Sequence, residues 1–347
     1  MPWPWRRKTR RTMARIAIEG AIAGATRTRV LKALRQVEQR ECPALLLLPF
    51  ALWGTAMAAM RPLLDGGTPL QVASLRLLPA GGLVLLAAVL LGRPLRVAAA
   101  DWPWLLAFAL VDGSLFQGLL AQGLGQTGAG LGSVLIDSQP LLVALLARSL
   151  FGEAINPVGW IGLLLGLLAI LCLGLPAPVL QHWWLEGPAA LGERAWSHGE
   201  LWMLAAAAAM ALGTVLSRFA SSQSDPVAIT GWHMLIGGVP LLAGVGWEGP
   251  LLPSWTAAEW GWMAYATVLG SALAYGLFFW FASSGDLTGF TALTFLTPVF
   301  ALFCGVWLLE EQLRPLQWLG AALALVSVLL INQRQQLWRG PVPAEQS

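Results

Sequence analysis

The chain alternates between long apolar runs and short links rich in proline, glycine and polar residues. A helix that crosses about 30 Å of hydrocarbon needs roughly 20 mostly apolar residues. The run at 157–175 has no charged residue, and further runs lie at 200–217, 227–247 and 315–332. The pattern predicts about ten membrane-spanning helices. They are expected near residues 44–60, 70–91, 102–121, 128–149, 157–175, 200–219, 227–246, 260–282, 287–309 and 315–333.

Composition argues against a water-soluble fold. Of the 347 residues, 57% are hydrophobic and only 11% are Asp, Glu, Lys or Arg, whereas soluble domains usually carry about 25% charged residues. So few charges could not cover a water-facing surface on a chain of this length. We therefore predict an all-α integral membrane protein that crosses the cell membrane several times.

Basic residues gather at the amino terminus, where 11 of the 21 Lys and Arg residues precede Pro43. Residues 1–43 are expected to form a basic cytoplasmic arm that lies on anionic lipid. A solvated tail, or a true start at Met13, remains an open alternative. Short links on the same side as this arm hold more arginines than the opposite links, which places both termini, including the tail 334–347, in the cytoplasm. Those inner links carry Arg93, Arg96, Arg148, Arg218, Arg334 and Arg339.

The two halves of the chain share landmarks at a nearly constant spacing. Gln139-Pro140 recurs as Thr297-Pro298, 158 residues later, and Phe151-Gly152-Glu153 recurs at the same offset as Leu309-Glu310-Glu311. Asp101-Trp102-Pro103-Trp104 likewise matches Glu259-Trp260-Gly261-Trp262. Several landmarks in the same order predict an internal repeat.

The repeat units are expected at residues 44–175 and 200–333, joined by an extracytoplasmic linker at 176–199. Each unit would hold five helices. Because five is an odd number, the second unit must enter the membrane from the opposite face, which gives inverted-topology repeats. Such repeats in transporters hold substrate near the bilayer midplane between the halves.

These motifs resemble the EamA type of the drug/metabolite transporter superfamily over about residues 44–333. The matching motifs are Trp53-Gly54, Leu75-Arg76-Leu77, Pro140, Leu150-Phe151-Gly152-Glu153, Pro157, Gly162, Pro298, Leu308-Leu309-Glu310-Glu311, Pro315 and Gly320. The resemblance implies a ten-helix bundle with a central cavity and transport of amino acids, other metabolites or drugs, often coupled to protons. This chain departs from the pattern where His233 replaces the second arginine and helix 6 lacks the tryptophan.

Four ionisable residues within the predicted helices are candidates for substrate binding or ion coupling, because a charged side chain inside a membrane is costly unless it is paired or hydrated. Asp112 could couple protons or bind a cation, or it could be a paired structural residue. Asp137 precedes Pro140, which frees a backbone carbonyl and predicts a locally opened helix and a cavity wall. Arg76 could bind a carboxylate, pair with one of these aspartates or snorkel. His233 could titrate, or simply satisfy a hydrogen bond.

Other polar or aromatic residues are weaker candidates. Gln117 and Tyr275 occupy equivalent positions in the two repeats and could contact substrate or join helices. Trp53 could close the cavity or serve in packing. Gate or helix-end roles are assigned to Glu153, Glu311, Pro140 and Pro298.

The leading functional hypothesis is a secondary transporter that exports a small metabolite by alternating access, with the proton as a candidate coupling ion. The sequence has no Gly-rich Walker loop for ATP. The alternatives are a receptor or scaffold without transport and a membrane-embedded enzyme that modifies lipids. We expect no catalytic residue, metal, cofactor or nucleic-acid partner. The expected partners are a small-molecule substrate and lipid. Whether the protein is a monomer or a homodimer is left open.

Overall fold

A computed structural model describes residues 43–127, 132, 135–174, 198–283, 285–301, 303 and 315–338. Within these ranges every regular element is a helix. The predicted all-α class is therefore confirmed. Most of the basic arm, the linker at 176–199, the end of the tail and the candidate Glu311 lie outside the described residues.

Helices occupy the described parts of both predicted repeats. The first half contains α2 (Pro43–Met60), α3 (Leu63–Gly66), α4 (Pro69–Leu90), η1 (Ala99–Asp101), α5 (Trp102–Phe108), η2 (Ala109–Phe116), α6 (Gln117–Thr127), α8 (Gln139–Phe151) and α9 (Pro157–Gly174). The second half contains α12 (His198–Ala220), α13 (Pro226–Glu248), α14 (Ala257–Thr267), η3 (Val268–Leu273), α15 (Ala274–Ala282), α16 (Leu287–Thr291), η4 (Ala292–Leu296), α18 (Pro315–Asn332) and α19 (Arg334–Leu337).

Seven of the described helical segments are long and apolar enough to cross a membrane. They are Ala44–Gly66, Pro69–Leu90, Ala99–Thr127, His198–Ala220, Pro226–Glu248, Ala257–Ala282 and Pro315–Asn332. Three shorter apolar helices, Gln139–Phe151, Pro157–Leu173 and Leu287–Ala301, lie where the other three spans were predicted. A multi-pass membrane protein is thus supported, and the count of ten spans stays a prediction.

Helix starts follow from local capping. Thr68 accepts a hydrogen bond from the Gln71 backbone while the Gln71 side chain accepts one from Thr68, which begins α4 with a capping box. Asp225 caps α13 by accepting from the amides of Val227 and Ala228, at 2.9 and 3.2 Å. These caps satisfy the backbone donors that a helix leaves free in its first turn.

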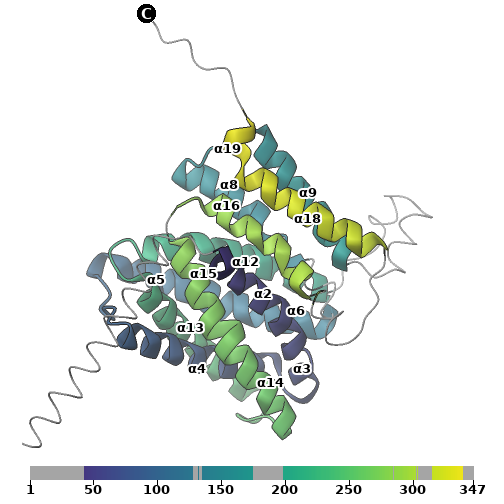
Figure 1. Ribbon diagram of the computed structural model, residues 1–347. Coiled ribbons are helices and arrows are strands. Elements are labelled where there is room, and N and C mark those ends of the chain that lie inside the picture. The colour runs from purple at the N-terminus through teal and green to yellow at the C-terminus, as the bar shows by residue number, and fades with distance from the viewer. Residues whose placement is uncertain are drawn as a thin grey trace, which may run out of the picture.

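The helices pack in pairs that join the two halves. Helix α4 lies along α13, and α9 lies along α18 on the other side of the bundle (Figure 1). Helix α8 packs on both α12 and α16. Helix α2 packs on α14, η3 and α15, whereas α12 packs on α5, η2 and α6. If each first-half helix is replaced by its second-half equivalent, the same pairs are obtained. This symmetry of helix contacts is expected of two related halves.

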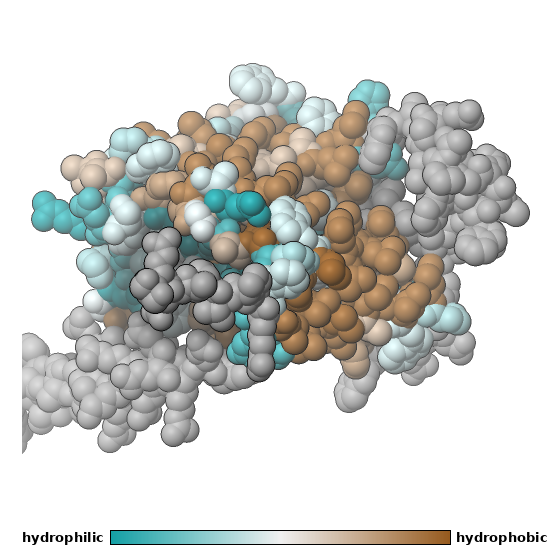
Figure 2. Space-filling view, turned by 90° about the horizontal axis from the view of Figure 1, so that it is seen from above, coloured by the Kyte–Doolittle hydropathy of each residue, from teal (hydrophilic) through white to brown (hydrophobic). Residues whose placement is uncertain are grey.

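The outer surface is apolar, as a lipid-facing surface must be. Large side chains such as Leu86, Leu110, Ile161 and Leu325 are more than half exposed. Figure 2 shows hydrophobic atoms over much of the visible face, with hydrophilic residues gathered toward one side. In water such a surface would be an aggregation site, but hydrocarbon solvates it without cost.

Candidate functional site

Four of the predicted spans have an irregular backbone, and the irregularities lie at equivalent positions in the two halves. Helices α5 and α6 are joined by the π-helix η2, and α14 and α15 by the π-helix η3. A turn at Asp137 and Ser138 precedes α8, and the 3-10 helix η4 precedes Thr297 and Pro298. Such departures loosen the regular backbone ladder and are frequent at functional sites. The opening predicted ahead of Pro140 is therefore present.

Arg76 of α4 is the centre of a buried polar network. Its guanidinium donates to the Ser271 hydroxyl in η3, at 2.9 Å, and to the side-chain oxygen of Gln117 in α6. Gln117 in turn donates to the Tyr275 hydroxyl of α15, at 3.2 Å. Arg76 is only 3% exposed, so it does not snorkel, and its hydrogen bonds go to neutral groups instead of to either aspartate. The network ties both halves together through one buried positive charge.

Asp112 of η2 and His233 of α13 form a second buried pair. The carboxylate Oδ2 and the imidazole Nε2 lie 3.1 Å apart, and both side chains are fully buried. Phe108 stacks on the imidazole with ring centroids 4.0 Å apart. Phe279 lies 5.3 Å from His233 and 5.9 Å from Tyr275 by ring centroids. One aromatic ring therefore neighbours both polar groups.

Close backbone approach makes room for Asp112. An added Cβ at Gly213 of α12 would lie 2.6 Å from the Asp112 side chain. At Gly113 it would lie 2.8 Å from the His233 carbonyl oxygen and 2.9 Å from the Gly237 Cα. Small residues let membrane helices approach this closely. Glycines at these positions thus fix η2 against both α12 and α13.

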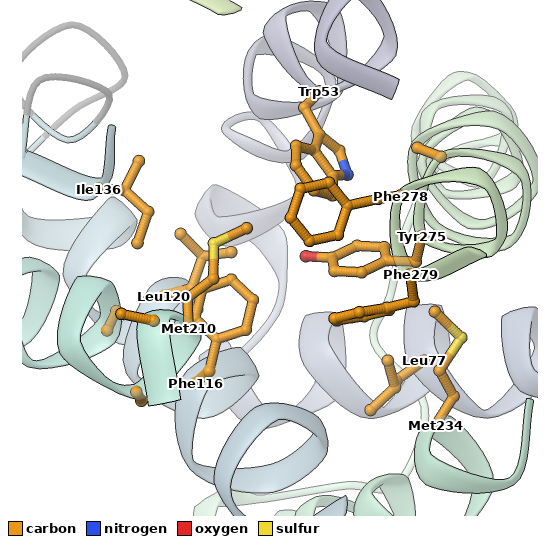
Figure 3. Packing of buried hydrophobic residues seen from close by; sticks show 14 of the residues in the cluster. Trp53, Leu77, Phe116, Leu120, Ile136, Met210, Met234, Tyr275, Phe278 and Phe279 are labelled. Carbon is orange, nitrogen blue, oxygen red and sulfur yellow. The ribbon is translucent and has the colours of Figure 1, made fainter. Parts of the chain in front are cut away.

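A small cavity of about 40 Å³ lies between the halves. Its wall comes from α2, α4, η2, α6, α12, η3, α15 and the two helix interruptions. The lining residues are Trp53, Ala56, Met57, Met60, Arg76, Phe116, Leu120, Ile136, Asp137, Met210, Gly270, Tyr275, Thr294 and Thr297. In Figure 3, Trp53 lies over Tyr275 and Phe278, and the Tyr275 hydroxyl points toward the side that holds Phe116 and Met210.

Five side chains in this wall each keep a buried polar atom that has no hydrogen-bond partner in the part of the chain that the structure describes. These atoms are Trp53 Nε1, Arg76 Nε, Asp137 Oδ2, Thr294 Oγ1 and Thr297 Oγ1. Buried polar groups are nearly always paired, so an unpaired group calls for an explanation such as a bound water or a ligand. The cavity wall therefore offers several donors and one carboxylate to whatever enters it.

Glu153 lies elsewhere, at one end of the bundle. Its carboxylate accepts from the Leu287 and Thr288 amides at 2.8 and 3.0 Å, and from the Thr288 hydroxyl at 2.7 Å. It also lies 3.5 Å from the Arg218 guanidinium. Glu153 therefore caps α16 of the second half from the end of α8 in the first half. We call this region, with Asp286 and Arg334, the ionic end.

A bidentate pair completes the ionic end. Arg334 donates from Nη1 and Nη2 to the Asp286 carboxylate, at 2.8 and 2.9 Å. Burial acts to raise the pKa of Asp286, but hydrogen bonds from Arg334 and from the Gly289 backbone outweigh it and hold that pKa below its ordinary value. Arg218 also donates to the carbonyl oxygens of Ala282 and Gly285. The termini of α8, α12, α15, α16 and α18 are thereby fastened together.

The structure brings most of the predicted candidates into one region. Arg76, Gln117 and Tyr275 form one network and Asp112 and His233 another. Trp53 and Asp137 line the cavity, Pro140 and Pro298 follow the two helix interruptions, and Glu153 is at the ionic end. Sequence reasoning named Thr297 only as a landmark of the repeat and gave no site role to Ser271, Thr294 or Gly213. Serine, threonine and glycine are common in membrane helices, and only their position in the repeat could have singled them out.

Comparison with known proteins identifies the family. The model of the EamA-like transporter family matches residues 42–175 and 197–333. An uncharacterized transporter of Synechocystis is 56% identical over 297 residues, which are 84% of this chain and 90% of that protein. A WAT1-related chloroplastic protein of Arabidopsis thaliana is 46% identical over 292 residues, 83% of this chain and 68% of that protein.

A solved crystal structure with 17% sequence identity has a TM-score of 0.68 and covers 85% of this chain and 96% of its own. That likeness shows a shared fold. The family match spans most of the chain and both predicted repeats. Together with the apolar helices, it establishes that this chain is a multi-pass membrane transporter of the EamA-like transporter family, within the drug/metabolite transporter superfamily.

Proposed function

We propose that this transporter is a secondary carrier that exports a small metabolite by alternating access through the cavity between its two halves. The observation that carries the proposal is the set of five unpartnered polar atoms in a cavity wall that both halves build. Substrate sites in transporters with inverted repeats lie at this kind of interface, beside interrupted helices. The interruptions at Asp137 and ahead of Thr297 support the assignment.

The wall suggests what the substrate carries. Trp53, Arg76 and the two threonines present donors, so one end of the substrate would offer acceptors such as carboxylate or hydroxyl oxygens. Asp137 could accept from a donor at the other end. Methionines and aromatic rings in the wall would hold an apolar body, because thioethers adapt to varied shapes. Amino acids, related metabolites and drug-like compounds all fit this description.

The cavity volume supports a change of shape during transport. About 40 Å³ can hold a few water molecules, whereas ligand pockets measure about 300–1,000 Å³. We propose that this is the narrow conformation and that the halves separate to admit substrate. The ionic end would be closed in this conformation, with Glu153 and Arg218 as its gate residues.

Proton coupling is assigned to Asp112 and His233. The pair is fully buried, its Oδ1 and Nδ1 atoms have no partner among the described residues, and Phe279 neighbours both His233 and Tyr275 of the Arg76 network. A proton held by this pair would change the charge beside that network. That change is a physical route from proton binding to substrate binding.

The test uses the purified chain in proteoliposomes, screened with labelled amino acids and other small metabolites, with and without a pH gradient. We expect accumulation or counterflow of at least one compound. Asp137→Asn should raise the substrate concentration needed for half-maximal transport, whereas Asp65→Asn, at an exposed residue outside the cavity, should leave transport unchanged.

The same assay separates the alternatives. Binding of a compound without counterflow would favour a receptor or scaffold, and chemical conversion of a lipid would favour an enzyme. Either result would overturn the carrier. A cysteine at Asp137 offers an independent measurement: a small water-soluble thiol reagent should modify it, and substrate should protect it. A cysteine there that reacts in no condition would contradict the cavity assignment.

A further inference from the structure

A second, separate hollow lies on the outer face of the bundle, between α4 and the η3–α15 segment. Its volume is about 380 Å³, and Arg93 is the one charged residue among the described side chains that line it. It begins near the middle of the two spans, at Leu83 and Val268, which are 37% and 46% exposed. It ends at Arg93 and Trp280, near the ends of the two candidate spans Pro69–Leu90 and Ala257–Ala282. We call it the lateral groove.

The charged end of the lateral groove is rigidly built. Helix α4 ends at Leu90, and Gly92 follows its C-cap residue with a φ of 70°, the left-handed conformation that favours glycine. The Arg93 amide then donates to the Ala88 carbonyl at 2.9 Å, which fixes where the arginine leaves the helix. The Arg93 guanidinium lies 2.8 Å from Asp225 and 5.3 Å from the centre of the Trp280 ring.

The shape and chemistry match one kind of molecule that every membrane supplies. An acyl chain would lie along the apolar floor, from the middle of the bilayer to the surface. Its headgroup would then meet Arg93, whose side chain is one quarter exposed, and the exposed Arg96 three residues later. Tryptophan is enriched at headgroup depth, and juxtamembrane basic residues attract anionic lipids.

We propose that the lateral groove is a binding site for an anionic phospholipid, with one acyl chain between α4 and α15 and the headgroup phosphate at Arg93 and Arg96. Asp225 neutralises part of the Arg93 charge, so the exposed Arg96, three residues further along the chain, would supply the second positive charge to the phosphate. The bound lipid would brace α4 of the first half against α15 of the second. The proposal does not depend on which metabolite is carried.

The structure offers a clean way to fill the groove. Gly276 lines it, and no atom lies within 4 Å of the place where a Cβ would be added. Gly276→Leu should therefore occupy the groove without disturbing the protein. Gly82→Leu is the matched control, because Gly82 is exposed on α4, has equally open space and is not in the groove wall.

The experiment places the full chain in phosphatidylcholine vesicles that contain phosphatidylglycerol with a photoactivatable diazirine in one acyl chain. Cross-linked peptides should come from 83–91 and 268–280, and unlabelled phosphatidylglycerol should compete better than phosphatidylcholine. Gly276→Leu should lower this labelling several-fold and Gly82→Leu should not. Arg96→Gln should reduce the preference for phosphatidylglycerol; Arg93→Gln should do so too, provided that its thermal unfolding matches the wild type.

Three results would overturn the proposal. The first is equal labelling of the wild type and Gly276→Leu. The second is equal competition by the two lipids, which would leave an acyl groove without headgroup recognition. The third is a cross-link between two copies of the chain through α15, which would assign the groove to a dimer contact.

Discussion

Asp112 and Asp137, the two buried aspartates among the predicted candidates, differ in their surroundings, which supports the different tasks proposed for them. Asp112 has a partner in His233, 3.1 Å away, whereas Asp137 is 4% exposed and its Oδ2 atom has no partner among the described residues. An acidic residue at the centre of a membrane helix costs about 2.5–3.5 kcal/mol by insertion scales. Pairing offsets that cost for Asp112. Asp137 Oδ2 has no such partner among the described residues, as expected of a group that binds ligand or water.

Replacing Asp112 with asparagine tests its role in coupling. The amide keeps the size and a hydrogen bond to His233 but cannot exchange a proton. We expect accumulation driven by a pH gradient to fall to the level reached without a gradient, while substrate exchange continues. Both are measured in the same proteoliposomes. Undiminished gradient-driven accumulation in Asp112→Asn would remove Asp112 from the coupling mechanism.

Gly213 is predicted to be intolerant of even a methyl group. In Gly213→Ala the new Cβ would lie 2.6 Å from the Asp112 side chain, so α12 and η2 must move apart. Overpacking of this kind typically costs about 1–3 kcal/mol. Thermal unfolding in detergent should show a lowered Tm. Gly261→Ala is the control because open space surrounds that position; an equal Tm for the two variants would refute the close approach.

At the scale of elements, apolar runs were enough to locate the helices, since a buried or lipid-facing helix leaves a long uncharged stretch. Pro140 was enough to locate the interruption before α8. The π-helices η2 and η3 had no such mark, because inserting one extra residue into a helical turn requires no particular side chain. The partners of Arg76 were also beyond prediction, since Ser271 is 195 positions away in the chain.

The ionic end is expected to make the thermal stability of the protein depend on pH. The pKa of Asp286 is held below its ordinary value of about 3.9, so its carboxylate stabilises the fold above that pH. The contribution is lost as the pH falls through the lowered value. Wild-type protein should therefore lose more in Tm between about pH 6 and about pH 3 than Asp286→Asn does. Because Asp286 is 45% exposed, the difference should be small.

A matched control is available for the pH experiment. Asp65 also pairs with an arginine, Arg61 at 2.7 Å, but its side chain is 70% exposed. Surface pairs of this kind contribute about 0–1 kcal/mol. The Tm of Asp65→Asn should follow the wild type across the pH range. If Asp286→Asn also follows it, the bidentate pair with Arg334 does not hold α18 to α16.

At the scale of the whole molecule, the repeat accounts for the pattern of helix contacts. Helix α2 packs on the α14–α15 segment just as α12 packs on the α5–α6 segment. Asp101 begins one of these segments and bonds to Ser222 and Ser224, beside the Arg93–Asp225 pair at the far end of α4. Glu259, its repeat counterpart, lies near Gly66, just ahead of the start of α4. The equivalent segments α5–α6 and α14–α15 therefore begin at opposite ends of α4. Inverted repeats require this arrangement.

Inverted repeats of five helices make a definite prediction about topology. Ten spans bring the chain back to the side from which it started, so tags at Met1 and Ser347 should be reached by antibody from one and the same side of the membrane. In a variant without native cysteines, a single cysteine at Arg96 should react with an impermeant thiol reagent from that side, and one at Asp65 only from the other. From the positive-inside tendency we expect the shared side to be the cytoplasm. Tags on opposite sides would mean an odd number of spans. One of the three short helices, Gln139–Phe151, Pro157–Leu173 or Leu287–Ala301, would then fail to cross, and two antiparallel five-helix units could not be built from this chain.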